Sequence, residues 1–380
     1  MSRKYYFSSE SVTDGHPDKV CDQIADAILD EALRRNKHAK MAVEATVKDD
    51  IVVVYGEQNL YANLDPKNLP KDFDPTIDFA SIAKQVLKDI GYEHEFKVFV
   101  LVGSQSKDIF DKVVLGDETA AGDQGIMFGY ACNDTENYMP LAIDTAHKLS
   151  KRLSDFKRED SRIKPDGKTQ VTVLYEDDKP VKITKVVVST QHAKELHLPE
   201  LRELIRKEVI DKVIDPKWID LNDFETIINP GGNFIIGGPE GDSGTTGRKI
   251  VVDTYGGMGR IGGGCFSSKD PSKVDRSAAY YCRYVAKNIV AHNLADRCEI
   301  QVSYAIGMKK PLSVYINTFG TEKQPIETIE KIVERNFDFT VGNIIEELKL
   351  LRPIYRKTSN FGHFGRSDSD FTWEAIKTLK

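Results

Sequence analysis

A helix–hairpin–helix pattern occurs three times along this chain of 380 residues, at nearly equal spacing. Paired runs rich in Val, Ile, Thr and Tyr predict β-hairpins whose first strands begin at residues 41, 169 and 299. An amphipathic helical stretch precedes each hairpin, and another follows it. Any α/β chain can produce such a pattern by chance. A true repeat of about 129 residues predicts an α+β fold of three similar domains, each a β-sheet with helices on one face.

The expected elements and boundaries follow from the same pattern. Hairpins are expected over 41–48 with 51–57, 169–175 with 181–191, and 299–306 with 312–319. Helices are expected over 18–35, 79–90, 141–153, 198–213, 273–294 and 326–333, with a further strand over 97–103. The long polar stretch 105–119 is typical of a lid or a disordered segment. We therefore divide the chain into an N-terminal domain (1–104), a mobile active-site loop (105–119), a central domain (120–230) and a C-terminal domain (231–380).

Charge and composition exclude several classes of protein. The net charge is −6, whereas nucleic-acid-binding and membrane-surface proteins carry a basic stripe. No apolar run has the length of a membrane span, and the first ten residues lack a hydrophobic signal core. The five cysteines are odd in number and have no CxxC spacing, which predicts reduced thiols. We expect a cytoplasmic protein that binds neither nucleic acid nor membrane.

Glycine is concentrated in one part of the sequence. Thirteen of the 27 glycines lie between residues 231 and 264, and a charged segment, 269–276, follows. Glycine allows backbone N–H groups to approach a ligand, and adjacent cations and carboxylates suit a metal-bound polyphosphate. A flexible linker is the alternative, but 234–236 and 249–252 resemble short buried strands. This region therefore predicts a phosphate-binding site.

A second candidate site lies near the N-terminus. Pro17 suits the first position of a helix, which places His16, Asp18 and free N–H groups at a helix N-terminus, where anions bind. Ordinary helix capping explains the same residues equally well. Asp18 is equally suited to hold Mg²⁺, because proteins bind this ion through a small number of carboxylates.

Other motifs are weaker. The segment 120–130 holds an aspartate between glycines and is either a turn with a buried Phe or a grip for an ammonium group. Residues 164–168 precede a strand and favour a turn. Lys168, at the start of that strand, would still reach a phosphate. The charged segment 157–167 is expected to face solvent. The sequence has no Walker A motif, no kinase signature, no nucleophile elbow and no zinc-type His/Cys spacing.

These motifs resemble the S-adenosylmethionine synthetase (methionine adenosyltransferase) family over almost the whole chain. The family signatures match 120–125 with Gly129 and Tyr130, 262–270, 15–19, 237–249, 273–277 and 362–366. The resemblance implies three α+β domains related by pseudo-threefold symmetry. It also implies dimers, usually within homotetramers, that bury a flat sheet surface and form active sites at the subunit interface.

The resemblance implies a reaction of ATP, L-methionine and water that yields S-adenosylmethionine, phosphate and pyrophosphate. The methionine sulfur attacks C5′ of ATP and displaces triphosphate, which is then hydrolysed. A thioether carries no proton, so the attack needs no general base. The protein must instead align the substrates and stabilise a polyanionic leaving group.

The resemblance also assigns roles to residues of this chain. His16 lies near the departing oxygen, Asp18 and Asp275 hold Mg²⁺, with two ions per site, and Glu44 holds K⁺. The ATP contacts are His16, Asp166, Lys168, Asn233, Phe234, Asp242, Arg248, Lys249, Cys265 and Lys269. The catalytic members of this set are His16, Lys168, Arg248, Lys249 and Lys269. The methionine contacts are Glu57, Gln105, Asp123, Asp242 and Lys273, and Ile306 lines the pocket.

Three residues depart from the family pattern. Ala120 replaces the first glycine of the hexapeptide, Asn233 stands where many members have Arg, and Cys265 replaces a common Ala. Two other classes of function stay open at this point: a phosphoryltransferase or ATPase, and a non-catalytic polyanion-binding module.

Overall fold

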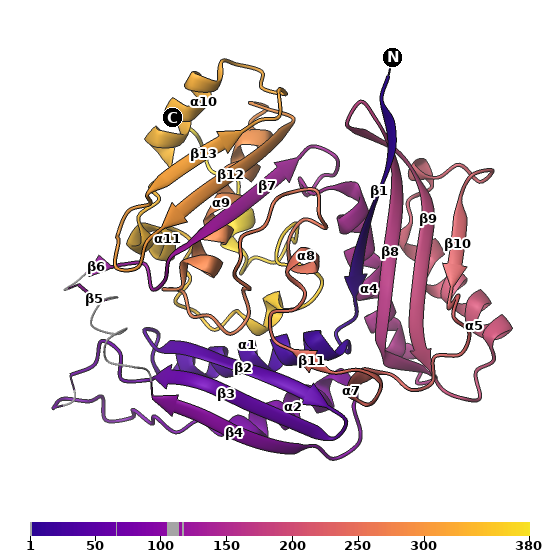
Figure 1. The fold of residues 1–380 in the computed structure, drawn as a ribbon, viewed down its shortest axis with the longest axis horizontal. Coiled ribbons are helices and arrows are strands. Elements are labelled where there is room, and N and C mark those ends of the chain that lie inside the picture. Colours follow the sequence, from indigo (N-terminus) through magenta and orange to yellow (C-terminus); the bar gives the residue numbers. More distant parts are fainter. Residues whose placement is uncertain (1, 66, 105–113, 116–117) are drawn as a thin grey trace.

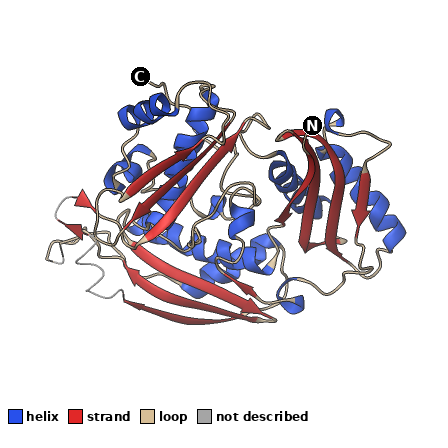
Figure 2. Cartoon of the chain, turned by 45° about the horizontal axis from the view of Figure 1, so that its top comes forward, coloured by secondary structure: helices blue, strands red, loops and turns tan. Residues whose placement is uncertain are grey.

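Three β-sheets with their helices surround a centre of loops and short helices (Figure 1). The computed structural model describes residues 2–65, 67–104, 114–115 and 118–380. Helices lie against one side of each sheet (Figure 2). The predicted three-domain α+β fold is confirmed.

The first two units follow the same order of elements, and the third follows it with an additional short helix and without a last strand. The first contains β1 (Lys4–Val12), α1 (Pro17–Arg35), β2 (Lys40–Lys48), β3 (Ile51–Asn59), α2 (Phe79–Ile90) and β4 (Lys97–Ser104). The second contains β7 (Gly125–Cys132), α4 (Leu141–Glu159), β8 (Ile163–Glu176), β9 (Lys179–His192), α5 (Leu198–Ile205) and β10 (Glu225–Ile228). The third contains β11 (Gly244–Thr245), α8 (Ile250–Asp253), α9 (Val274–Ala291), β12 (Arg297–Tyr304), β13 (Ser313–Asn317) and α10 (Ile326–Asn336).

Shorter elements connect these units. Between β4 and β7 lie β5 (Val114–Leu115) and β6 (Glu118–Thr119), which pair with each other. After α5 the helical path continues through a π-helical turn (Arg206–Ile210) into α6 (Asp211–Val213), followed by a 3₁₀ turn, Pro216–Trp218. The third unit adds α7 (Gly238–Gly241), α11 (Val341–Glu347) and 3₁₀ turns over Arg356–Thr358 and Thr372–Glu374.

The first strand of each unit leaves its own unit and joins the hairpin of another. β1 pairs with β8, β7 pairs with β12, and β11 pairs with β2, all three antiparallel. In two sheets the last strand of the unit then adds in parallel to the second hairpin strand, β4 to β3 and β10 to β9. The three units are therefore linked in a closed ring by exchanged strands. The domain boundaries given above stay a prediction, because each sheet contains a strand from outside the range of its hairpin.

The hairpins and the long helices lie where the sequence predicts them, with small differences at their ends. The expected turn over 164–168 is wrong, because these residues lie within β8: Gly167 and Lys168 pair with β9, Lys168 also pairs with β1, and the register shifts between Ile163 and Gly167. The segment 157–167 does not face solvent throughout, because Lys157 is buried against Asp14, and Asp166 is also buried.

Two predicted strands are also absent. Residues 234–236 form no strand, and 250–253 form the short helix α8. Both segments are apolar. Apolar runs this short do not distinguish strand from helix or loop by themselves.

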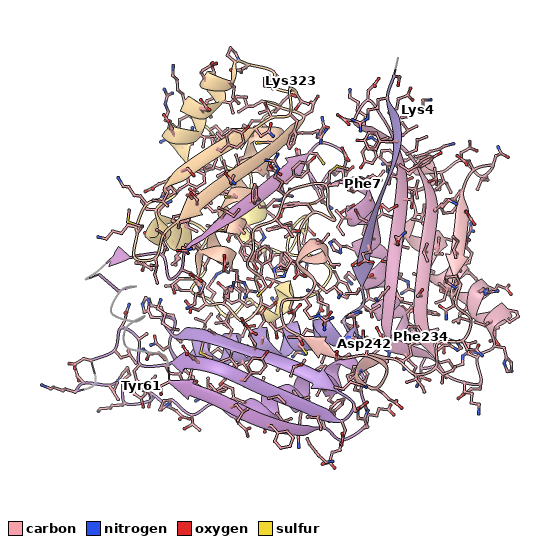
Figure 3. All side chains as sticks on the ribbon, viewed as in Figure 1. Lys4, Phe7, Tyr61, Phe234, Asp242 and Lys323 are labelled. Atoms are coloured by element: carbon pink, nitrogen blue, oxygen red, sulfur yellow. The ribbon has the colours of Figure 1, made fainter. Side chains whose placement is uncertain are left out.

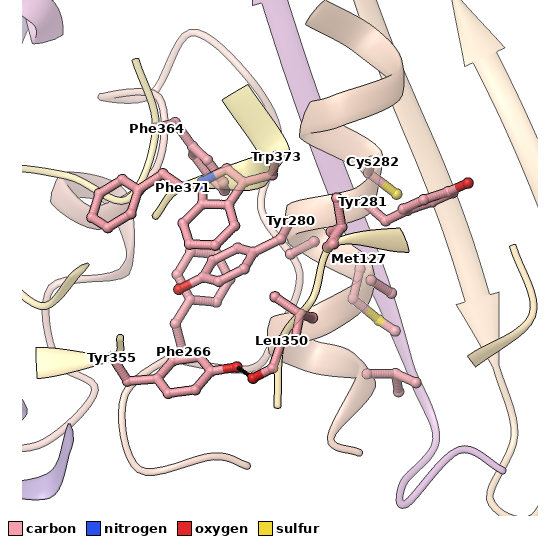
Figure 4. Close-up of a cluster of buried hydrophobic side chains, with 14 of the residues drawn as sticks. Met127, Phe266, Tyr280, Tyr281, Cys282, Leu350, Tyr355, Phe364, Phe371 and Trp373 are labelled. Atoms are coloured by element: carbon pink, nitrogen blue, oxygen red, sulfur yellow. Dashed lines mark hydrogen bonds between the residues drawn. The ribbon is translucent and has the colours of Figure 1, made fainter. Parts of the chain in front are cut away.

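The centre of the third unit is packed with aromatic rings (Figure 4). Tyr280 of α9 stacks on Trp373 with ring centroids 4.0 Å apart, and Tyr255 stacks on Phe364 at 5.0 Å. Tyr355 donates its hydroxyl hydrogen to the carbonyl of Leu350 at 2.6 Å. A hydrogen-bonded aromatic core of this kind fixes the C-terminal segment against α9.

Helix α1 joins the first unit to the third. His16 caps its N-terminus, Pro17 occupies the first turn as predicted, and Arg34 and Arg35 lie in the last turn. Four aspartates at four-residue spacing run along α1, and all four are buried: Asp18, Asp22, Asp26 and Asp30. Because a buried carboxylate requires donors, each of them fixes the position of a segment from the third unit or the C-terminal region.

The cysteines bear out a further expectation. All five cysteines are free thiols, and four of them are buried. No helix in the part of the chain that the structure describes is both long and apolar enough to cross a membrane.

Candidate functional site

The first cluster of predicted site residues forms where the exchanged strand β11 meets the start of α1. Asp18 accepts a hydrogen bond from the backbone N–H of Thr245 at 3.0 Å and an ion-paired bond from Lys249 Nζ at 2.5 Å. Arg248 lies 3.7 Å from the other side of the same carboxylate. A helix start from the first unit and two cations from the third unit therefore share one site.

His16 is neutral in this cluster. Burial, reinforced by the charge of Lys249, lowers the pKa of His16 to about 3. Its Nδ1 accepts the backbone N–H of Asp18 at 3.2 Å. In a neutral imidazole the other nitrogen, Nε2, then carries the hydrogen and is available as a donor.

The pKa values of two nearby carboxylates are shifted in opposite directions. Burial opposes ionisation of Asp18, but the bonds from Lys249 and Thr245 outweigh it and lower the pKa of Asp18. Burial instead raises the pKa of Asp166, although this carboxylate accepts the N–H of Gly238 at 2.8 Å. The structure thus combines an ionised carboxylate with one that protonates more readily.

Strand β8 adds a further cation to this cluster. Lys168 pairs with Val12 at the end of β1, is exposed, and lies within electrostatic range of His16. Asp242, at the end of α7, is also exposed and close enough to influence His16. The register of β1 on β8 therefore brings Lys168 beside the start of α1.

Phe234 lies on the neighbouring loop, and Figure 3 labels both Phe234 and Asp242 at the junction between two of the sheets. The backbone N–H of Phe234 donates to His192 Nε2 at 3.1 Å, and its carbonyl accepts from His192 N at 2.9 Å. A Cβ at Gly237 would lie 2.8 Å from the Phe234 ring, so glycine is needed there. Asn233 beside it is exposed.

The second cluster centres on Lys269. Its Nζ lies 2.5 Å from the Asp275 carboxylate, and both side chains are mostly buried. A Cβ at Gly264 would fall about 2.2 Å from the Asp275 carboxyl carbon, which explains a glycine in this motif. Lys269 also forms an isolated antiparallel bridge to Ala42 of β2.

The sheet of the first unit brings Glu57 and Glu44 to this side. Ala42, which bridges Lys269, pairs on its other side with Glu57 of β3. Glu44 pairs with Tyr55 two residues further along and accepts the tyrosine hydroxyl at 3.4 Å. Glu57 is exposed and Glu44 is half-buried.

The remaining methionine candidates lie on connecting segments. Gly122 N donates to Ser272 O at 3.3 Å, which holds the loop of Asp123 against the segment of Lys273. Ile306 is 45% exposed, and the next residue, Gly307, donates to the carbonyl of Ala121 at 2.9 Å. Gln105 and most of the predicted loop (105–113 and 116–117) lie outside the described residues.

Cys265 connects the two clusters. A Cβ at Gly247, directly before Arg248, would lie 2.7 Å from the Cys265 sulfur. Burial raises the pKa of Cys265 to about 11, so the group is a thiol at neutral pH. Its role here is therefore close packing between the segments that carry Arg248 and Lys269.

Metal binding by the described residues would need ligands beyond them. Among the described residues, no group of three or more His, Cys, Asp or Glu side chains is arranged to hold a metal ion. Asp18 and Asp275 each have an ionisable carboxylate that is now paired with a lysine. One or two carboxylates completed by substrate phosphates is the usual coordination of Mg²⁺, so these residues fit the ion.

The structure also reveals supporting residues without predicted roles. Lys19 is fully buried, donates to Asp22 at 2.9 Å and also to Asp253 of α8. Asp22 in turn accepts the N–H of Gly247 at 2.9 Å. These bonds hold the segment that carries Lys249. The four-residue spacing of aspartates in the predicted helix is a signal that could have indicated them.

The chain is similar to known proteins over nearly its whole length. Family profiles described as S-adenosylmethionine synthetase match as the N-terminal domain over 4–107, the central domain over 118–234 and the C-terminal domain over 236–375. The S-adenosylmethionine synthase of Sorangium cellulosum (strain So ce56) is 48% identical over 98% of this chain and 88% of its own length. That of Myxococcus xanthus (strain DK1622) is 48% identical over 100% and 95%, respectively. Because the profiles and the relatives both span nearly the whole chain, the chain belongs to the S-adenosylmethionine synthetase family.

Proposed function

We propose that this chain is a methionine adenosyltransferase, which makes S-adenosylmethionine from ATP and L-methionine, and that the two clusters form its active site. The observation that carries this assignment is the meeting of His16 and Asp18 with Arg248 and Lys249 at the start of α1. At this point the cations of the third unit lie beside the neutral imidazole of His16, which belongs to the first unit. This arrangement suits a triphosphate whose bond to C5′ is being broken.

The neutral imidazole of His16 has a defined task in this proposal. Because Nδ1 accepts the N–H of Asp18, Nε2 carries the hydrogen and donates it to the oxygen that leaves C5′. The pKa of His16, about 3, keeps this tautomer available throughout the neutral range. No proton has to be removed from the methionine sulfur, so no general base is assigned.

The cations stabilise the leaving triphosphate. Lys168, Arg248, Lys249 and Lys269 are the proposed set, of which Lys249 and Lys269 are held by carboxylates in the absence of substrate. When bound by Asp18 and Asp275, two Mg²⁺ ions would neutralise phosphate charge, and K⁺ at Glu44 would support the same site. The lysines would then be free to contact phosphate oxygens.

The two substrates are assigned to different sides of the site. Adenosine is assigned to Phe234, Asn233, Asp166, Asp242 and Cys265. Methionine is assigned to Glu57, Gln105, Asp123, Asp242 and Lys273, with Ile306 against its side chain. The acidic groups suit the ammonium group of the amino acid, and Lys273 suits its carboxylate.

We further propose that active sites are completed by a second copy of the chain. The outer face of the β2–β4 sheet carries Phe99 and Leu101, which are 53% and 69% exposed, whereas its inner face packs on α1 and α2. An exposed apolar sheet face of this kind is typical of a subunit interface. We infer a homodimer or a dimer of dimers that acts in the cytoplasm.

The experiment is an assay for S-adenosylmethionine with ATP, methionine and Mg²⁺, each omitted in turn, and with or without K⁺. The product should form only when all three are present, and K⁺ should accelerate its formation. ATP hydrolysis that proceeds equally without methionine would instead indicate an ATPase or a phosphoryltransferase. Full activity in EDTA would contradict the metal assignment.

A further inference from the structure

A basic cleft of about 730 Å³ lies beside α11. None of its described lining residues is a predicted substrate or metal ligand, although Thr119 ends the predicted active-site loop. Five cations and one acidic residue contribute to its walls: Lys37, Lys309, Lys310, Lys349, Arg352 and Glu346. Lys37 follows the C-terminal end of α1, whereas His16 caps its N-terminus. The 19 residues of the helix separate these two ends by about 28 Å.

Three of these five cations have no partner among the described residues. The ammonium groups of Lys37, Lys310 and Lys349 make no hydrogen bond or ion pair within the part of the chain that the structure describes. Elsewhere on the surface, lysines such as Lys151 are paired with a carboxylate at 2.6 Å. A concave concentration of cations in a protein of net charge −6 produces a local positive potential that attracts anions.

The backbone fixes the elements that carry these cations. Val341 N donates to the carbonyl of Lys309 at 3.0 Å, which joins the turn after β12 to the start of α11. Arg352 Nε donates to the carbonyl of Lys349 at 2.7 Å, and Arg352 also pairs with Asp370 at 3.3 Å. The positive groups therefore converge before any ligand arrives, which lowers the entropy cost of binding.

The walls indicate the class of ligand. The volume is that of a small-molecule site, and Thr119 and Thr340 add hydroxyl groups. The described lining residues include no aromatic ring on which a nucleotide base could stack. We propose that this cleft binds a small polyphosphate anion, with pyrophosphate as the simplest example, separately from the catalytic clusters.

Binding there would reach the catalytic loops through the backbone. The turn that carries Lys309 and Lys310 is hydrogen-bonded to the segment before Gly122, because Ala121 N donates to Met308 O at 2.9 Å and Gly307 N donates back to Ala121 O. An anion held by these lysines stabilises the turn, and with it the position of the Asp123 loop. The cleft is therefore connected by hydrogen bonds to a loop of the proposed active site, as a regulatory site would be.

The test uses inorganic pyrophosphate, titrated by calorimetry in EDTA into the full chain. The triple variant Lys37→Gln/Lys310→Gln/Lys349→Gln removes the unbalanced charges, and Lys71→Gln/Lys84→Gln/Lys331→Gln is the matched control on other exposed lysines. The wild type and the control should show two classes of site, because the catalytic cations also bind pyrophosphate. The triple variant should lose one class, with affinity falling roughly ten-fold or more for each contact removed.

Lys310 is exposed, so Lys310→Gln should keep the fold, and it should weaken the same class of site without abolishing it. Without added pyrophosphate, all variants should make S-adenosylmethionine at the wild-type rate, so failure of this inference is distinguishable from failure of the proposed function. A single class of site in the wild type, or two unchanged classes in the triple variant, would overturn the proposal.

Discussion

The four buried aspartates of α1 hold segments of the third unit and of the C-terminal region against this helix. Asp26 accepts both guanidinium NH₂ groups of Arg276 at 2.8 Å, and Asp30 accepts the N–H groups of Tyr355 and Arg356. Isolated in water, such a row of like charges would disfavour the helix. In the folded chain each carboxylate instead meets a donor from beyond residue 244. The row of aspartates in α1 is therefore compatible with a stable helix only when the segments beyond residue 244 are folded against it.

Lys19 provides the sharpest test of this network. Burial alone would lower its pKa, but Asp22 and Asp253 raise the pKa of Lys19, so it stays charged. Lys19→Met leaves two buried carboxylates without their cation, and we expect a loss of about 3–5 kcal/mol in the free energy of unfolding. Urea denaturation measures this loss. The control, Lys151→Met, breaks an exposed pair and should change stability far less; equal losses would contradict the network.

The role of His16 is tested by His16→Asn. Asparagine also caps helices well, so the fold should be preserved, with an unchanged melting temperature. Losing the oriented donor to the departing oxygen should cost about 3–4 kcal/mol, or roughly 10²–10³ in the rate of S-adenosylmethionine formation. Hydrolysis of added triphosphate should be affected much less, because its reacting bond is elsewhere. If both reactions slow equally, His16 is a general phosphate contact.

Among the elements, local patterns predicted the hairpins and long helices well, and non-local pairing explains what they missed. Period-two alternation and helical spacing identify β2, β3, α1 and α9 without knowledge of their partners. β11 has only two residues, so no periodicity could reveal that it joins β2. The same limit applies to the site: Pro17 pointed to His16 and Asp18, but their contact with Lys249 depends on that pairing.

Close packing between elements explains a glycine of the family signature. A Cβ at Gly129 of β7 would lie 2.1 Å from the backbone carbonyl carbon of Cys282 in α9, and backbone cannot move aside as a side chain can. Gly129→Ala should therefore separate β7 from α9 and cost about 1–3 kcal/mol of stability, measured by denaturation. Gly103→Ala in β4 is the control, because nothing lies within 4 Å of its added carbon. Similar stability in both variants would reject this explanation.

At the scale of the whole molecule, the ring of exchanged strands leaves an apolar sheet face directed outward. Leu101→Glu places a charge on the most exposed large apolar side chain of β4. If this face is the subunit interface, the variant should be monomeric by light scattering and should lose most of its synthetic activity. Leu221→Glu, at a position 80% exposed on another surface, is the matched control and should remain oligomeric and active. An oligomeric Leu101→Glu variant would place the interface elsewhere.

The strand exchange also has a consequence for synthesis on the ribosome. β1 and β7 emerge before the hairpins they join, but β11 emerges about 200 residues after its partner β2. The sheet begun first therefore stays incomplete until β11 has been made. Helix α1 waits longer still, because the donors to Asp26 and Asp30 come from Arg276 and from Tyr355 and Arg356. The nascent N-terminal unit exposes an unpaired edge of β2 until residue 245 has been made, and buried-to-be carboxylates without donors until residue 356 has been made. The nascent chain is therefore open to misassembly over that interval.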